Sequence, residues 1–453
     1  MTQFRTMTRS LSRIGLWVRP AAEPARSLRG LDWLNFFVAN FQTGFGPFIS
    51  VYLTGVGWTQ GAIGAALSAG TVAGMVSQVP GGILVDAMRS KRAAAAVAIL
   101  AIMASALLIA LWPALLPIAL AEVLHAFASS VLGPAIAALS LALVGHGAFG
   151  ERLGRNARYL AIGNAFAAGL MGTFGYLVGE RAVFLLTAAL AIPALAAIEM
   201  IRIADLSSAK IPPRPAPKSK PESTGWSWRF LRDRRLLAYA ACASLFQLAN
   251  AAMLPIAAGM VTKRAGSEAS LVIAACIVAP QAVTAVISPW AGRAAESWGR
   301  RPILLVGFAV LPIRGMLFAG ITDPYLMILI QLLDGLSAAA LGVLTPLIVA
   351  DITRDTGGYT TALGVVGLAI GGGATLSTTA AGLLADHLGN EATFLGLAAV
   401  GLCATFLVAT VMPETRLATA QRGGKAGSLR KGHSAANNGA SGLPGFSNSA
   451  GDP

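Results

Sequence analysis

Twelve long apolar runs, separated by short polar segments, dominate the chain. Each run has about 20–30 residues, the length that an α-helix needs to cross the hydrocarbon of a bilayer. Because lipid cannot satisfy backbone amides and the runs lack the alternation of barrel strands, helices are the expected conformation. The predicted membrane helices are 31–53, 61–84, 93–112, 115–144, 159–178, 182–201, 236–261, 269–291, 302–321, 325–350, 361–385 and 393–412.

A polar segment in the middle of the chain divides these helices into two groups of six. Between 205 and 235 the chain carries five prolines and several lysines, as expected of an extended linker. We therefore predict an all-α polytopic membrane protein with two six-helix bundles, 31–204 and 236–412. The segments outside the bundles are an N-terminal cytoplasmic tail (1–30), the cytoplasmic linker (205–235) and a disordered cytoplasmic tail (413–453), which is rich in Gly, Ser and Asn.

Basic residues lie almost entirely on one side of this arrangement. With the N-terminus placed inside, 30 of the 34 Lys and Arg residues fall in cytoplasmic segments, and Arg181, Lys263 and Arg264 fall on the opposite side. Arg314 lies within a predicted helix. This bias follows the positive-inside rule, so we expect both termini in the cytoplasm and the protein in a bacterial inner membrane.

Composition narrows the classes of function. The chain is 55% hydrophobic and 12% charged, with a mean hydropathy of +0.67. The net charge of +14 is concentrated in the topology segments, which argues against a nucleic-acid partner. Cys242, Cys276 and Cys403 lie in apolar runs without metal-ligand spacing, so we expect neither disulfides nor a metal site.

Motifs of the common enzyme classes are missing from the sequence. It contains no phosphate-binding loop, nucleophile elbow or metalloprotease motif. No segment is long enough for a nucleotide-hydrolysing domain. We therefore expect a non-enzymatic protein without cofactors, acting as a monomer, whose partners are the lipid bilayer and a small-molecule substrate.

The two groups of six helices are weakly related in sequence. The stretch 122–133 (EVLHAFASSVLG) aligns with 331–342 (QLLDGLSAAALG) at a shift of 209, and Gly163 aligns with Gly372. Near a shift of 208, Pro47 aligns with Pro255. Transporters built from two parallel repeats bind their substrate near the middle of the membrane, between the repeats.

A motif of glycine, acidic and basic residues follows the second and the eighth predicted helix. Both copies resemble the signature G-x-x-x-D-(R/K)-x-G-(R/K)-(R/K) of the major facilitator superfamily, in which it occupies these two loops. The second copy matches better, because Ala87 and Arg89 replace a basic residue and a glycine in the first. The motif residues are Gly82, Asp86, Arg89, Lys91 and Arg92 in the first copy, and Gly292, Glu296, Gly299, Arg300 and Arg301 in the second.

The resemblance covers roughly residues 31–412, and the stretch 32–53 looks like the opening helix of bacterial drug-efflux and siderophore-export members. It implies a conformational latch: the glycine lets two helices approach, while the acid accepts hydrogen bonds from a helix N-terminus and pairs with Arg. The alternative is a plain anchoring loop.

Four ionisable residues lie deep within predicted helices: Glu122, His125, Arg314 and Asp334. Such a residue costs at least about 2.5 kcal/mol on insertion, so it usually faces a cavity or a partner. In the resembled superfamily the first, fourth, seventh and tenth helices line the central cavity, which implies that His125 and Asp334 face each other. We interpret the four residues as a proton-coupling site. The alternative is two static pairs, Asp334–Arg314 and Glu122–His125, that hold helices together.

Uncharged polar residues in the first and seventh helices are candidates for substrate contacts, although hydrogen bonds between helices would explain them equally well. They are Asn35, Asn40, Gln42, Gln247 and Asn250. The function we expect is secondary active transport, namely proton-coupled export of a small amphipathic organic compound driven by the proton gradient. Alternatives are an exporter or importer of an anionic metabolite or siderophore, and a non-transporting membrane receptor or scaffold.

Overall fold

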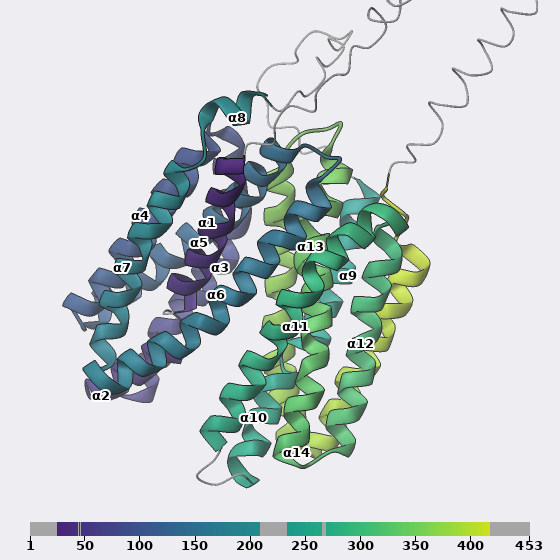
Figure 1. The fold of residues 1–453 in the computed structure, drawn as a ribbon. Helices are drawn as coiled ribbons and strands as arrows, with labels where there is room; N and C mark the ends of the chain where they lie inside the picture. Colours follow the sequence, from purple (N-terminus) through teal and green to yellow (C-terminus); the bar gives the residue numbers. More distant parts are fainter. Residues whose placement is uncertain (1–24, 44, 46, 209–232, 265–268, 417–453) are drawn as a thin grey trace, which may run out of the picture. The chain divides into compact units, whose positions relative to one another are not determined.

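A computed structural model describes residues 25–43, 45, 47–208, 233–264 and 269–416, and all regular structure in these ranges is α-helical (Figure 1). The predictions for the two tails and the linker fall largely outside the described residues. The N-terminal half contains α1 (Ala25–Thr43), α2 (Pro47–Gly55), α3 (Gln60–Ala87), α4 (Lys91–Leu111), α5 (Leu115–Val144), α6 (Phe149–Val178), α7 (Glu180–Glu199) and the short α8 (Ile203–Ser208). The C-terminal half contains α9 (Arg234–Asn250), α10 (Met253–Arg264), α11 (Ala269–Trp298), α12 (Arg300–Gly320), α13 (Pro324–Thr353) and α14 (Tyr359–Val411).

These helices account for twelve membrane crossings. Ten helical segments of the described chain are long and apolar enough to span a bilayer. One of them, α14, contains the non-helical Gly389, whose φ of 83° is open to glycine, and this break divides it into two crossings. The first predicted crossing corresponds to α1 and α2, and the seventh to α9 and α10. The all-α architecture expected from the apolar runs is thus confirmed.

Local sequence signals start several of the helices. The side chain of Thr59 accepts a hydrogen bond from Ala62 N at the start of α3, and Ser90 accepts one from Ala93 N at the start of α4. Asp323 caps α13 in the same way, with Pro324 at the first helical position. These caps fix where the chain turns back into the bundle.

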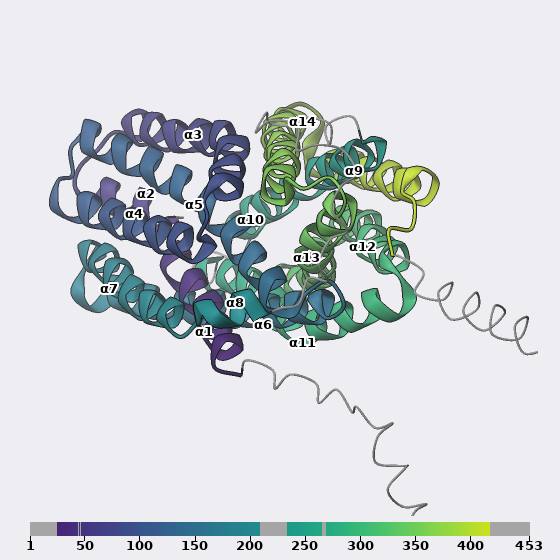
Figure 2. The ribbon, with the colours of Figure 1, turned by 90° about the horizontal axis from the view of Figure 1, so that it is seen from above.

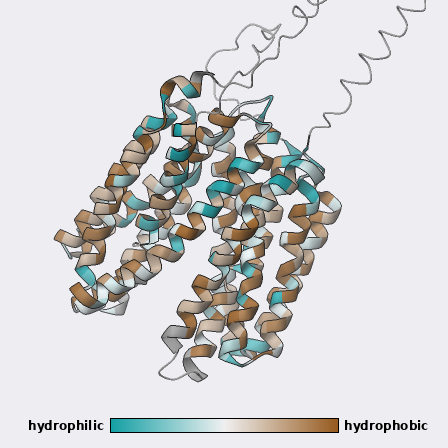
Figure 3. Cartoon of the chain, viewed as in Figure 1, coloured by the Kyte–Doolittle hydropathy of each residue, from teal (hydrophilic) through white to brown (hydrophobic). Residues whose placement is uncertain are grey.

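Two sets of helices pack within the part of the chain that the structure describes. Seen from above, α1–α5 and α7 gather together, as do α9 and α11–α14, while α6 packs against α11 and α3 against α14 (Figure 2). Buried apolar residues of α1–α5 and α7 form one hydrophobic cluster. Those of the C-terminal half form two more, one of which includes Phe149 and Leu153 of α6. Many large apolar side chains remain exposed along the helices, and hydrophilic residues are more frequent near the end where α8 lies (Figure 3). This distribution suits helices surrounded by lipid.

Candidate functional site

The second motif copy joins α11 to the beginning of α6. Glu296 Oε1 accepts hydrogen bonds from the backbone N–H groups of Gly150, at 2.7 Å, and Glu151, at 3.3 Å. These amides lie in the first turn of α6, where N–H groups lack helical partners and the helix dipole favours a carboxylate. The helices cross in backbone contact, because a Cβ atom on Gly292 would lie 2.2 Å from the carbonyl oxygen of Gly150.

The first motif copy makes the equivalent contact between α3 and α14. Asp86 accepts hydrogen bonds from the backbone N–H groups of Thr360, at 3.3 Å, and Thr361, at 2.8 Å, and from the Thr361 hydroxyl, at 2.7 Å. A Cβ atom on Gly82 would lie 2.2 Å from the Thr360 carbonyl oxygen. Asp86 and Glu296 are 210 positions apart, as are Gly82 and Gly292. The two copies therefore hold the halves together in the same way, although the first departs from the signature.

The basic residues of the second copy belong to a charge network. Arg300 Nε lies 2.9 Å from Asp351 Oδ2 of α13, and the Arg300 and Arg301 backbone N–H groups donate to the Glu414 carboxylate at 2.9 and 3.0 Å. Gly299 caps α12 with a φ of 109°. This network ties α12, α13 and the segment after α14 to one another.

The basic residues of the first copy are engaged differently. Lys91 donates to the carbonyl oxygens of Met88, at 2.9 Å, and Asp86, at 3.1 Å, and so binds the free carbonyls that end α3. Arg92 forms a 2.5 Å ion pair with Glu199, and Arg89 is exposed. Arg300 Nη1 likewise donates to the Ala295 carbonyl oxygen of α11 at 2.7 Å, so a basic residue caps the preceding helix in both copies, and the second copy adds the contact with Asp351.

Within the membrane region, Arg314 of α12 pairs with Asp334 of α13. Arg314 is 1% exposed and Asp334 is 27% exposed, so the pair has one buried and one partly accessible end. The guanidinium also lies 6.0 Å from the centre of the Phe318 ring. The ion pair that the sequence allows between these consecutive helices is present.

His125 lies in a small polar group between α1 and α5. Its Nε2 is 3.3 Å from Gln42 Oε1, which also accepts a 3.3 Å hydrogen bond from the Ser129 hydroxyl. The ring of Phe45 stacks on the imidazole at a centroid distance of 3.8 Å. Among the described residues, no hydrogen bond or ion pair joins this group to the Arg314–Asp334 pair.

Glu122 has no such partner. It is 7% exposed, and its Oε1 atom has no hydrogen-bond partner among the described residues. The carboxylate packs on Gly70 of α3, where a Cβ atom would lie 2.6 Å from Oε2. The alternative pair Glu122–His125 is therefore not formed in this structure.

Among the other predicted substrate-contacting residues, two on α1 bind their own helix. Asn35 Nδ2 donates to Leu31 O at 2.7 Å and Asn40 Nδ2 donates to Phe36 O at 2.8 Å. Oδ1 of Asn40 and Oδ1 of Asn250, which are 210 positions apart, are buried without a partner in the described part of the chain. Gln247 on α9 is half-buried.

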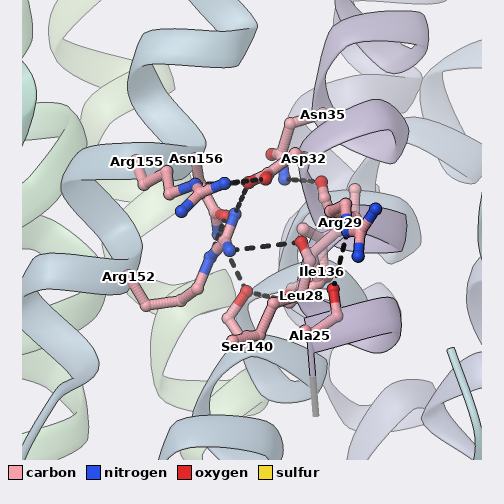
Figure 4. A network of polar contacts seen from close by, with 11 residues as sticks. Ala25, Leu28, Arg29, Asp32, Asn35, Ile136, Ser140, Arg152, Arg155 and Asn156 are labelled. Carbon is pink, nitrogen blue, oxygen red and sulfur yellow. Dashed lines mark hydrogen bonds and ion pairs between the residues drawn. The ribbon is translucent and has the colours of Figure 1, made fainter. Parts of the chain in front are cut away.

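One polar network is not predicted by the sequence analysis (Figure 4). Asp32 of α1 is held by Arg152 Nη2 at 2.5 Å and by Arg155 through Nε at 3.0 Å and Nη2 at 2.5 Å. Asn156 accepts from Arg152 Nε at 2.7 Å and donates to the Ser140 hydroxyl at 2.8 Å. The network therefore connects α1, α5 and α6 at one end of the N-terminal half.

One signal could have found Asp32, whereas the apolar run hid the two arginines. Asp32 lies inside the first predicted helix, where an acid needs a partner. The apolar run that begins at residue 159 places Arg152 and Arg155 in a loop, whereas α6 begins at Phe149.

Gln331 is also absent from the predicted site. It aligns with Glu122, is 1% exposed, and has no partner for either polar atom within the described ranges.

Comparisons with known proteins give the chain its family. The family model described as Major Facilitator Superfamily matches residues 31–280 and 255–440. Two proteins of Mycobacterium tuberculosis strains, both described as uncharacterized MFS-type transporters, are 36% identical to it over 406 residues, which cover 87% of this chain and 95% of theirs.

Two further likenesses are more limited. A puromycin resistance protein of Streptomyces alboniger is 34% identical over 97 residues, 21% of this chain and 19% of that protein. The solved structure of a proton:xylose symporter shares the fold with a TM-score of 0.62 at 12% identity, over 87% of this chain and 97% of that one. The two motif copies, the helical architecture and these matches agree, and the chain belongs to the major facilitator superfamily of membrane transporters.

Proposed function

We propose that this transporter exports a small amphipathic organic compound in exchange for protons. The observation that carries the proposal is the buried carboxyl of Glu122 in the N-terminal half, whose Oε1 has no partner among the described residues, together with the partly accessible Asp334 in the C-terminal half. An unpaired buried acid contributes nothing to the stability of a membrane protein, which supports a role for Glu122 in which it gains and loses a proton.

The coupling follows from the surroundings of these two acids. In this structure Asp334 pairs with Arg314, and a proton arriving at Asp334 would release that guanidinium. Glu122 has no partner for Oε1 among the described residues, and a cationic substrate that reached it would compete with a proton for the carboxyl group. Because proton and substrate favour opposite states of the same groups, binding of one would expel the other.

The latch contacts supply the conformational part of the cycle. Asp86 and Glu296 each hold a helix N-terminus of the opposite half, and both contacts lie at the end of the bundle predicted to be cytoplasmic. In this arrangement the halves are joined on the cytoplasmic side. Breaking both contacts would let the halves part there and expose the central site to the cytoplasm.

An amphipathic substrate without net negative charge suits the charges available. The buried cation Arg314 is already neutralised by Asp334, which leaves no free cation among the deep ionisable residues to bind an anion. The similarity of a short stretch to a puromycin resistance protein also favours efflux. The anionic metabolite or siderophore is therefore the weaker candidate.

Proton movement in inverted membrane vesicles tests the proposal. Energised vesicles carrying the protein are exposed to a panel of cationic amphipathic compounds and siderophores, and lumenal pH is followed by fluorescence. We expect a substrate to trigger proton release, and Glu122→Gln and Asp334→Asn vesicles to show little or none. Glu391→Gln, which changes an exposed carboxylate, is the matched control and keeps the response.

A response retained in both acid variants would remove these residues from the coupling role. A folded protein that moves protons with none of the compounds would contradict proton-coupled export of this substrate class.

A further inference from the structure

A pocket lined by arginines lies between α6 and α11, where the two halves meet. Its volume is about 600 Å³, and the first turns of α6 and the last turns of α11 form its walls. Arg155 and Arg158 come from α6 and Arg293 from α11, with Glu151 as the acidic residue of the lining. The pocket is next to the Glu296 contact and at the end of the bundle predicted to be cytoplasmic.

Two of the three guanidinium groups are not paired with a carboxylate among the described residues. Arg155 is committed to Asp32 through two of its nitrogens. Arg158 donates through Nε to the carbonyl oxygen of Ala285 at 3.0 Å, which points its side chain across to α11. Neither Arg158 nor Arg293 forms an ion pair with a carboxylate of the described residues. Planar guanidinium groups that converge on one space suit the oxygens of a phosphate.

The same pocket is apolar toward the membrane interior. Ile162 follows Arg158 by one turn of α6, and Val286 precedes Arg293 by two turns of α11, so each pair shares a helix face. Ile162 is 44% exposed and Val286 is 68% exposed. A basic cleft that continues into an exposed apolar groove matches a phospholipid, whose phosphate lies at the interface and whose chains lie deeper.

We propose that this pocket binds a phosphate group, supplied by the headgroup of an anionic phospholipid of the cytoplasmic leaflet. The phosphate contacts Arg158 of one half and Arg293 of the other, and the acyl chains lie along Ile162 and Val286. By bridging α6 and α11, the lipid stabilises the arrangement in which these helix ends are together. This site is separate from the proposed proton-coupling residues and does not depend on the substrate.

Thermal unfolding of the purified full-length protein tests the site. Short-chain phosphatidylglycerol is titrated into the detergent-solubilised protein, with short-chain phosphatidylcholine and inorganic phosphate as parallel arms. We expect phosphatidylglycerol to raise the unfolding temperature saturably and phosphatidylcholine to leave it unchanged. Removing one arginine near the surface should weaken the apparent affinity about fivefold, the equivalent of about 1 kcal/mol.

Arg293→Gln is the main variant, because the Arg293 side chain joins no ion pair among the described residues. Arg202→Gln, which removes an exposed charge at the same predicted membrane side, is the matched control and keeps the wild-type affinity. Equal affinities of wild type and Arg293→Gln for phosphatidylglycerol would overturn the proposal. A shift produced equally by inorganic phosphate would overturn the lipid as its source and leave a phosphate site.

Discussion

At the scale of single residues, the ion pair Arg314–Asp334 and the lone carboxyl of Glu122 differ in what they contribute to the stability of the fold. Arg314 is almost fully buried and depends on Asp334 for its countercharge. Glu122 has no described partner for Oε1 and is accommodated because Gly70 lacks a side chain. Asp334 therefore contributes to stability, whereas Glu122 can be replaced by a neutral side chain with little structural effect.

Replacing Asp334 should lower the stability of the protein more than replacing Glu122. Asp334→Asn leaves a buried, unpaired guanidinium, and we expect a loss of about 1–3 kcal/mol, less than for a fully buried pair because Asp334 is partly exposed. The double variant Arg314→Gln/Asp334→Asn should recover at least half of that loss. Glu122→Gln should stay within about 0.5 kcal/mol of wild type. Unfolding in detergent measures all three, and a double variant less stable than Asp334→Asn would contradict the pairing.

His146, in the segment between α5 and α6, should make stability depend on pH. Burial lowers the pKa of its imidazole below the usual range, Arg354 lowers it further, and Asp351 and Asp355 oppose this shift. A lowered folded-state pKa means that the folded protein resists protonation, so stability is retained above the unfolded pKa, about 6.5, and falls as pH drops through it.

We expect His146→Gln to reduce the loss of unfolding temperature between pH 7.5 and 5.5, which we would follow by thermal scans at fixed ionic strength. A steeper loss in the variant would show that folding favours the protonated imidazole, which is the opposite of what burial of His146 predicts.

At the scale of helices, backbone crossings matter more than side-chain contacts. A Cβ atom at Gly292 would lie 2.2 Å from a carbonyl oxygen of α6, which cannot yield as a flexible side chain can. We expect Gly292→Ala to destabilise the folded state by about 1–3 kcal/mol, measured by unfolding in detergent. Gly169→Ala on α6, where a Cβ atom meets no described atom within 4 Å, is the control and should be neutral or slightly stabilising, because alanine favours the helix. Equal effects of the two substitutions would contradict the close crossing.

Helix positions are largely predictable from the apolar runs, and helix ends are not. The run that predicts a helix from residue 159 marks the apolar part of α6, but the helix begins ten residues earlier, at Phe149. Polar residues such as Arg152 and Asn156 continue the helix because they satisfy one another and Asp32. Hydropathy shows whether a segment suits lipid or water, but it does not show which side chains distant in the sequence will pair with it. Asp32 is not among the predicted site residues because its partners, Arg152 and Arg155, lie far away in the sequence.

At the scale of the whole described unit, the two halves repeat each other imperfectly. The contacts of Asp86 and Glu296 lie 210 positions apart, close to the shift of 209 found in the sequence. The motif predicts where the halves touch, and the acidic residue and glycine suffice for this contact in both copies. Lys91 and Arg300 both bind carbonyl oxygens at the end of the preceding helix, and nothing in the motif indicates that Arg300 also binds Asp351.

The paired contacts predict that the halves separate only when both are weakened. A carboxylate at a helix N-terminus contributes about 0.3–1 kcal/mol, or up to about 2 kcal/mol when partly buried. We expect Asp86→Asn/Glu296→Gln to shift the population toward a state that is open at the end predicted to be cytoplasmic, more than either single variant does. Spin labels at Arg202 and Arg354, exposed residues of opposite halves, report this as a longer distance. Unchanged distances in the double variant would show that these contacts do not control opening.

Uphill transport by purified protein in liposomes tests the central claim most directly. A substrate found in the vesicle assay is offered outside liposomes whose interior is made acidic, and its accumulation is compared with exchange at equal pH. We predict that wild type accumulates substrate only with the pH gradient. Asp334→Asn and Arg314→Gln/Asp334→Asn should still exchange substrate but fail to accumulate it. Accumulation by Asp334→Asn at the wild-type rate, or by wild type without a gradient, would contradict proton coupling through this pair.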